Sequence, residues 1–195
     1  MKQTVLIVPG YLGSGPAHWQ SWMERQLPAT RRVAGIDWQR PALGRWTDRV
    51  EAAIKRADGP VWLVAHSFGC LAAVMAAALR PERIGGALLV APADPERFSA
   101  QGFRSGDEGS IASWLYDIRL RCPSLLVAST NDPWLNFASA AYWADRWGSR
   151  LHSQGAAGHI NVDSGFGPWP KGLAMLRALQ SAQGSFLVGE LAISV

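Results

Sequence analysis

The sequence predicts an α/β fold with a mostly parallel six-stranded sheet that helices cover on both faces. Short, continuous apolar runs alternate along the chain with longer segments in which apolar residues recur at helical spacing. The runs lack the in-out alternation of a half-exposed strand, which favours strands buried on both faces of a parallel sheet. With 195 residues and 48% hydrophobic content, the chain is long enough for one domain with a sizeable core.

The six expected strands are short apolar runs, and the sixth has the weakest pattern. They cover residues 4–9, 32–38, 61–65, 86–91, 125–129 and 150–154. Crossovers between parallel strands of one sheet are almost always right-handed, and we expect the same here.

The expected helices lie between these strands, at residues 16–27, 45–57, 68–79, 139–147 and 172–183, with a further short helix within 108–116. In the first, Trp19, Trp22, Met23 and Leu27 fall on one side. The domain is therefore expected to span residues 1–183. The last twelve residues, from Gly184, are expected to form a tail that is either disordered or adds an edge strand.

Composition and charge argue against several classes of protein. The net charge of +4 comes from scattered basic residues, with Arg31-Arg32 the densest cluster, whereas nucleic-acid binding needs a concentrated basic face. The apolar run at residues 5–8 is too short for a signal-peptide core, and no later stretch approaches a membrane span. Cys70 and Cys122 lack metal-ligand spacing. We expect free thiols in a cytoplasmic protein that binds neither nucleic acid nor a membrane.

A serine stands at the junction between the expected third strand and the helix that follows it. Ser67 lies in Ala65-His66-Ser67-Phe68-Gly69, a small-x-Ser-x-small pattern. Such a strand–helix turn is so tight that only small flanking residues avoid clashes, and it lifts the serine Oγ out of the sheet as a nucleophile. A helix N-cap serine is the alternative. We favour the nucleophile, because ligand sites of open α/β sheets lie at the carboxyl ends of strands.

A serine nucleophile needs a base, and the base needs a third group that orients it. The four candidates are His18, His66, His152 and His159. The side chain of His66 should point away from its neighbour in sequence, Ser67. His159 follows the last strand within a glycine-rich loop, residues 155–161, which can place an imidazole over the sheet edge. We therefore expect His159 to be the base.

Two aspartates at strand ends compete for the role of the orienting acid. Asp94 follows the fourth strand, and Asp132 follows the fifth. We favour Asp132, because Pro133 directly after it would fix its direction. The order Ser67, Asp132, His159 is then the chain order of α/β-hydrolase triads. Asp163 is expected to serve only its own loop.

The developing oxyanion of a tetrahedral intermediate needs hydrogen-bond donors. The backbone N–H of Phe68, the residue after the nucleophile, is one candidate, and that of Tyr11, in the glycine-rich loop after the first strand, is the second. This loop lacks the Lys-Ser/Thr ending of a P-loop, and Leu12 breaks a GxGxxG pattern, so we expect no nucleotide site.

Segments that could shape the substrate pocket are few. Trp134 and Trp169 lie beside the acid and after the base, and either is a candidate pocket wall, although core packing is the favoured alternative for each. The only candidate for a cap is the irregular segment 92–122, which is polar at residues 94–97 and 104–108. It can supply one short helix with Ile111, Trp114 and Leu115 as its apolar face, so we expect a minimal cap or none.

Four longer stretches carry a family resemblance. They are VPGYLGSGPAHWQSW near the N-terminus, LVAHSFGCL around Ser67, STNDPW at the acid and GHINVDSGFGPWPKG at the base. Through to about Ala182, the chain resembles the small α/β-hydrolase-fold serine hydrolases of the retinoblastoma-binding-protein (YdeN-like) family. The resemblance implies an intracellular hydrolase with Ser67, Asp132 and His159 as its triad. The segment Leu120–Ser124 lacks the glutamate of an LxCxE motif, so no pocket-protein partner is expected.

These observations predict a serine hydrolase that cleaves a small carboxylic ester or thioester through an acyl-enzyme intermediate. Its partner is a small acyl substrate, and we expect neither a cofactor nor a metal. Amide or peptide cleavage at the same site is one alternative, and a non-catalytic interaction module with a relic triad is another. The sequence does not indicate the leaving group or the oligomeric state.

Overall fold

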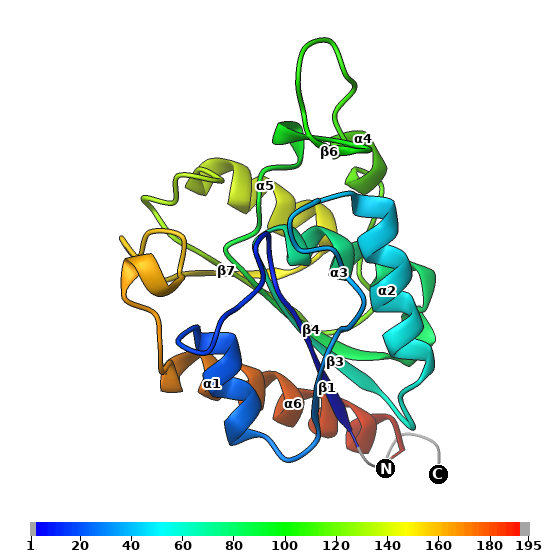
Figure 1. Cartoon of the computed structure of the whole chain (residues 1–195). Helices are drawn as coiled ribbons and strands as arrows, with labels where there is room; N and C mark the ends of the chain where they lie inside the picture. Colours follow the sequence, from blue (N-terminus) through cyan, green and yellow to red (C-terminus); the bar gives the residue numbers. More distant parts are fainter. Residues whose placement is uncertain (1–2, 192–195) are drawn as a thin grey trace.

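A six-stranded sheet forms the centre of the computed structural model, which describes residues 3–191 (Figure 1). Its strands are β1 (Thr4–Val8), β2 (Thr30–Arg32), β3 (Val61–His66), β4 (Ile84–Val90), β7 (Ser124–Ala128) and β8 (Arg150–Ser153). They lie in the order β2-β1-β3-β4-β7-β8, and every neighbouring pair is parallel. The parallel sheet expected from the continuous apolar runs is thus confirmed.

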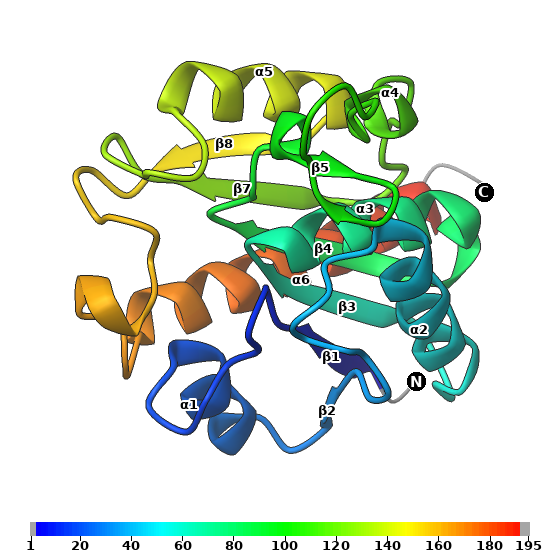
Figure 2. The ribbon, with the colours of Figure 1, turned by 45° about the horizontal axis from the view of Figure 1, so that its top comes forward.

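Helices cover both faces of this sheet, as predicted. They are α1 (Trp19–Gln26), α2 (Leu43–Lys55), α3 (Phe68–Leu79), α4 (Ala112–Leu115), α5 (Phe137–Trp147) and α6 (Pro170–Leu191). Figure 2 shows α1 and α6 on one side of the sheet, with α2, α3 and α5 on the opposite side. Three 3-10 turns, at Pro81–Arg83, Pro95–Arg97 and Val162–Ser164, lie in the connections.

Two hydrophobic cores fill the space between the sheet and its helices. The α1/α6 side buries Trp19, Met23 and Leu176, and the α2/α3/α5 side buries Trp46, Phe68 and Trp147. Successive residues of β1 alternate between the two cores, because side chains of a strand point to opposite faces. Both faces of the strand are therefore apolar, and this is why the strands appear as continuous apolar runs.

The second strand differs from its prediction over residues 32–38. Only Thr30–Arg32 pairs with β1, and Gly35, at φ +74°, turns the following residues away. This edge strand is partly exposed and carries two arginines, so it lacks the apolar signal from which the strand was predicted.

The last helix also departs from its predicted bounds. It begins at Pro170, whose fixed φ suits the first helical position, and continues past Gln183 to Leu191. Residues 184–191 are therefore helical, and they form neither a disordered tail nor an edge strand; residues 192–195 lie outside the described residues. Glycine in a helix costs about 1 kcal/mol relative to alanine, and Gly184 does not end this one. Within the described residues, no helix is both long and apolar enough to cross a membrane.

The segment between β4 and β7 contains little regular structure. It holds a short hairpin, β5 (Phe98–Ser99) with β6 (Gly102–Phe103), and the four-residue helix α4. Ile111 and Leu115 are buried as expected, whereas Trp114 is 44% exposed and does not belong to the apolar face. With only four residues, α4 makes about one turn, and its helical spacing alone does not account for the exposure of Trp114.

Candidate active site

Ser67 occupies a strained turn between β3 and α3. Its backbone has φ 54° and ψ −129°, a conformation that residues with a side chain rarely adopt. The Ser67 N–H donates to the carbonyl of Val90 on the neighbouring strand at 3.1 Å. Ser67 makes no side-chain cap of α3, so its Oγ does not serve as the helix N-cap.

Two glycines let the chain pass close to this turn. A Cβ on Gly69 would overlap the carbonyl oxygens of Val8 and Pro9 at the end of β1. A Cβ on Gly10 would lie 2.6 Å from the Cβ of Ser67. The loop after β1 therefore runs directly against Ser67, and the small residues seen in the sequence are needed for this approach.

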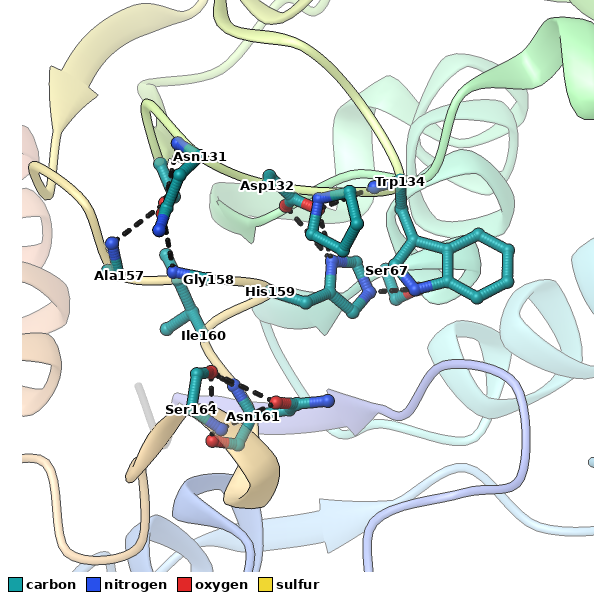
Figure 3. Close-up of polar contacts among 12 residues, drawn as sticks. Ser67, Asn131, Asp132, Trp134, Ala157, Gly158, His159, Ile160, Asn161 and Ser164 are labelled. Carbon is teal, nitrogen blue, oxygen red and sulfur yellow. Dashed lines mark hydrogen bonds and ion pairs between the residues drawn. The ribbon is translucent and has the colours of Figure 1, made fainter.

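The structure brings His159 and Asp132 to Ser67 in one hydrogen-bonded chain (Figure 3). His159 Nε2 is 2.9 Å from Ser67 Oγ, and His159 Nδ1 is 2.9 Å from each carboxylate oxygen of Asp132. The side chains of His159 and Asp132 are 9% and 2% exposed. An aspartate that accepts from Nδ1–H leaves Nε2 as the acceptor of the serine hydroxyl proton.

The rival aspartate lies elsewhere. Asp94 caps the 3-10 turn at Pro95–Arg97, where its Oδ1 accepts from the N–H of Glu96 at 3.0 Å. Asp132 also accepts from the N–H of Trp134 at 2.8 Å, and this bond holds the carboxylate within the turn that follows β7. Asp163 lies in the turn after His159 and lines the pocket beside it.

The loop that carries His159 is fastened to the turn that carries Asp132. Asn131 accepts through Oδ1 from the N–H of Gly158 at 2.8 Å, and Ser129 Oγ accepts from the N–H of Ala157 at 2.9 Å. Figure 3 shows Asn131 between the two segments. Sequence reasoning missed this role of Asn131, although its position next to Asp132 in a polar turn was a usable signal.

A second histidine, His66, forms a hydrogen bond to the backbone of His159. His66 Nε2–H donates to the backbone carbonyl of His159 at 2.9 Å, and the two ring centroids are 4.9 Å apart. Burial, followed by the nearby His159 and His18, lowers the pKa of His66 well below its usual value. His66 is therefore a neutral donor. His66 also lines the pocket that contains Ser67, and its support of His159 was not predicted.

The two residues expected to supply the oxyanion donors, Tyr11 and Phe68, line the same pocket as Ser67. Phe68 is the first residue of α3, so its N–H has no acceptor within the helix. In the loop after β1, the N–H groups of Leu12 and Gly13 are bonded to the carbonyls of Trp38 and Gly10. Among the described residues, no backbone acceptor meets the N–H of Tyr11 or that of Phe68.

A pocket of about 350 Å³ opens above Ser67. Aromatic residues form much of its wall: Tyr11, Phe68, Phe98, Phe103 and Trp134. Polar residues form another part: His18, His159, Asn161 and Asp163.

The two tryptophans proposed as pocket walls have different environments. Trp134 lines the pocket, with its ring centroid 6.0 Å from that of His159. Trp169 does not line it: this side chain is 5% exposed and packs at 5.2 Å against Trp19 in the α1/α6 core. Of the two alternatives that the sequence left open for Trp169, core packing is therefore the one that the structure shows.

The two cysteines are free, as expected. Cys70, three residues after Ser67, is buried, and its Sγ–H donates to the carbonyl of Val90 at 3.4 Å. Burial raises the pKa of the Cys70 thiol, and it raises that of Cys122 to about 11. Both thiols stay protonated near neutral pH, so neither is an activated nucleophile.

Comparison with known proteins identifies the family. A family model described as "Serine hydrolase" matches residues 5–178. The YdeN protein of Bacillus subtilis (strain 168), which is described as a hydrolase, is 26% identical over 176 residues, covering 87% of this chain and 92% of the relative. A crystal structure of a YdeN-like hydrolase from Pectobacterium atrosepticum is 38% identical, with a TM-score of 0.81 and coverage of 93% and 92%.

A more distant structure, Est1E from Butyrivibrio proteoclasticus with bound ferulic acid, shares the fold at 15% identity, with a TM-score of 0.64 and coverage of 98% and 90%. The retinoblastoma-binding part of the resemblance finds no support in these comparisons, whereas the YdeN-like part is confirmed. Because the family model spans most of the chain and the YdeN-like relatives align over most of their own length, the chain belongs to the YdeN-like serine hydrolases and is an enzyme of the α/β-hydrolase fold.

Proposed function

We propose that this hydrolase cleaves small carboxylic esters or thioesters, with Ser67 as nucleophile, His159 as base and Asp132 as the group that orients the base. The observation that carries the proposal is the chain of 2.9 Å hydrogen bonds from Ser67 Oγ through His159 to Asp132, at the floor of a pocket. A serine hydroxyl is a weak nucleophile by itself, and a hydrogen-bonded imidazole is what activates it.

The reaction proceeds in two halves. In the first, Ser67 Oγ attacks the ester carbonyl carbon while its proton passes to His159 Nε2, and Asp132 stabilises the imidazolium that forms. His159 then returns the proton to the leaving oxygen as the carbon–oxygen bond breaks, which leaves an acyl-enzyme. In the second half, water attacks the acyl carbon and gives a proton to His159 as the base. The bond from the acyl carbon to Ser67 Oγ then breaks, Oγ takes that proton back, and the acid is released.

The negative charge that develops on the carbonyl oxygen is stabilised by the backbone N–H groups of Phe68 and Tyr11 in this proposal. Both flank Ser67 and meet no backbone acceptor among the described residues. Donors held in place by the backbone need no rearrangement as charge develops, and one such donor is typically worth about 10²–10³ in kcat.

A matched ester and amide test this proposal against amide cleavage at the same site. Phenyl butyrate and butyranilide present the same acyl and phenyl groups to the wild-type enzyme, the Ser67→Ala variant and the Ser113→Ala control, which changes an exposed serine on α4. We expect turnover of the ester by the wild type and the control, and a loss of about 10⁴-fold or more in Ser67→Ala. Faster cleavage of the anilide would favour the amidase alternative, and turnover retained by Ser67→Ala would overturn the proposal.

A further inference from the structure

A third histidine forms part of the pocket wall. His18 is 5% exposed, lines the pocket above Ser67, and precedes the first residue of α1. Its Nδ1 accepts a hydrogen bond from the backbone N–H of Gln20 at 3.1 Å, and so caps the helix. One ring nitrogen of His18 is therefore committed to the fold.

The protonation state of His18 follows from its surroundings. Burial, then the charge of Arg32, then His159 lower the pKa of His18 to about 4. The N-terminus of α1 acts in the same direction, because the positive end of a helix dipole disfavours a cation. His18 is neutral near pH 7 and carries one ring proton. Since Nδ1 accepts a hydrogen bond, that proton lies on Nε2.

This Nε2–H has no hydrogen-bond partner among the described residues. Within the described residues, His18 Nε2 is not fully shielded from solvent. Because the ring lines the pocket, its free N–H opens into that pocket. An N–H group in the pocket that has no hydrogen bond to water or substrate raises the free energy of the protein. This is because a buried polar group without a partner loses its hydration without compensation.

The position of His18 indicates which part of the substrate it meets. The ring of His66 is adjacent to both of the other rings: its centroid is 4.9 Å from that of His18 and 4.9 Å from that of His159. His159 returns its proton to the leaving oxygen, so the leaving group has to lie next to His159. The polar residues Asn161 and Asp163, which follow His159 in sequence, line the same pocket.

We propose that His18 Nε2–H donates a hydrogen bond to an oxygen atom in the leaving group of the ester, and thereby selects alcohol groups that carry an acceptor. The inference rests on the proposed ester hydrolysis and adds the chemical class of the alcohol. His18 is a specificity-determining residue in this account, distinct from the three residues that carry out the bond exchange. A site built to hydrogen-bond a substrate discriminates strongly against an analogue without the polar atom, because its own polar group is left unpaired.

Two esters of nearly equal size test this selection. 2-Methoxyethyl butyrate and n-butyl butyrate differ in one atom of the alcohol, an ether oxygen in place of a methylene. We measure the ratio of their kcat/KM values in the wild type, in His18→Ser and in His152→Ser. His18→Ser keeps an oxygen that can cap α1 and removes the ring N–H. His152→Ser is the matched control, because His152 lies on β8 and does not line the pocket.

We expect the wild type and His152→Ser to share one preference for the methoxyethyl ester, and His18→Ser to lower that preference about tenfold. His18→Asn, which also retains a cap acceptor, replaces His18→Ser if the latter does not fold. An unchanged ratio in the His18 variants would overturn the inference. A preference that appears only for an ester with the ether oxygen in its acyl chain, and not in its alcohol, would also overturn the inference.

The experiment distinguishes a failure of the proposed ester hydrolysis from a failure of the inference about His18. Turnover of n-butyl butyrate by the wild type tests ester hydrolysis itself and does not depend on His18 selecting an oxygen. If the wild type cleaves amides instead, N-(2-methoxyethyl)butanamide and N-butylbutanamide give the same comparison of leaving groups. A tenfold effect of His18→Ser on that ratio would support the inference, and no effect would overturn it.

Discussion

His159 forms hydrogen bonds with three other residues, two through its ring and one through its backbone. His159 meets Ser67 through Nε2 and Asp132 through Nδ1, and its backbone carbonyl accepts from His66. The carboxylate favours the tautomer with the proton on Nδ1, which is the one that can accept the hydroxyl proton of the serine. The orientation of this ring therefore depends on residues at the ends of two strands, β3 and β7.

The acid is tested by a pair of matched substitutions. Asp132→Asn keeps the size of the side chain but disfavours the required tautomer of His159, so we expect kcat to fall by about 10²–10⁴-fold. Asp94→Asn changes a carboxylate that caps a 3-10 turn, and asparagine caps equally well, so we expect little loss. Steady-state hydrolysis of phenyl butyrate by both variants checks this. A larger loss in Asp94→Asn would transfer the role of the acid to Asp94.

The residues that meet in the candidate site were predictable for a physical reason. Ser67, Asp132 and His159 each follow a strand of a parallel sheet, and the carboxyl ends of such strands share one edge. The support from His66 and the free N–H of His18 were not predictable, because each depends on a ring orientation set by tertiary packing. The sequence left the choice between pocket wall and core packing open for Trp169 for the same reason.

At the scale of elements, the connection between β4 and β7 determines how much of the pocket is enclosed. It supplies Phe98 and Phe103 from its two-stranded hairpin to the pocket wall, but its one helix, α4, has four residues. Ile111 and Leu115 of this segment are buried in the α2/α3/α5 core, and neither lines the pocket. Such a segment gives a short aromatic wall and no deep channel.

This geometry predicts a preference for short acyl chains. Each methylene that is newly buried contributes about 0.8 kcal/mol, or nearly fourfold in binding, and a shallow pocket stops giving this gain after a few carbons. We expect kcat/KM to be highest for acetyl to butyryl esters in a series of phenyl esters from two to twelve acyl carbons. A maximum at eight carbons or more would mean that the β4–β7 segment encloses a long chain.

The elements that the sequence predicted well are the buried ones. β1, β3, β4 and β7 are covered on both faces, so their apolar runs have clear limits. β2 is a three-residue edge strand with polar residues, and β5 and β6 have two residues each. Strands of two or three residues are too short to show a pattern of apolar residues in the sequence, and their pairing depends on the tertiary structure.

At the scale of the whole molecule, two buried neutral histidines connect stability to pH. The pKa of His18 is lowered to about 4 and that of His66 well below its usual value, in both cases mainly by burial. In the unfolded chain both regain ordinary pKa values near 6.5. At pH values between the folded and the unfolded pKa of each histidine, the unfolded state binds more protons than the folded state. Lowering the pH therefore favours unfolding.

We therefore expect the free energy of unfolding to be constant with respect to these two groups above pH 7 and to fall as pH drops below 6.5. The part of the free energy of unfolding that depends on His18 is fully lost near pH 4. Each histidine changes the free energy of unfolding by at most about 1.4 kcal/mol per pH unit. Urea unfolding at pH 7.5, 6.5 and 5.5 measures this dependence. His18→Ser should weaken it, and an equally steep dependence in that variant would contradict the buried, neutral state of His18.

The central claim is that Ser67 is the activated nucleophile of this serine hydrolase. A fluorophosphonate phosphonylates only a serine whose hydroxyl is activated by a base, so its adduct reports the nucleophile directly. We expect intact-mass spectrometry to show one adduct per chain, and peptide mapping to place it on Ser67. The folded Ser67→Ala variant should remain unlabelled, whereas Ser113→Ala should label like the wild type. An unlabelled wild type, or an adduct that persists in Ser67→Ala, would contradict the claim.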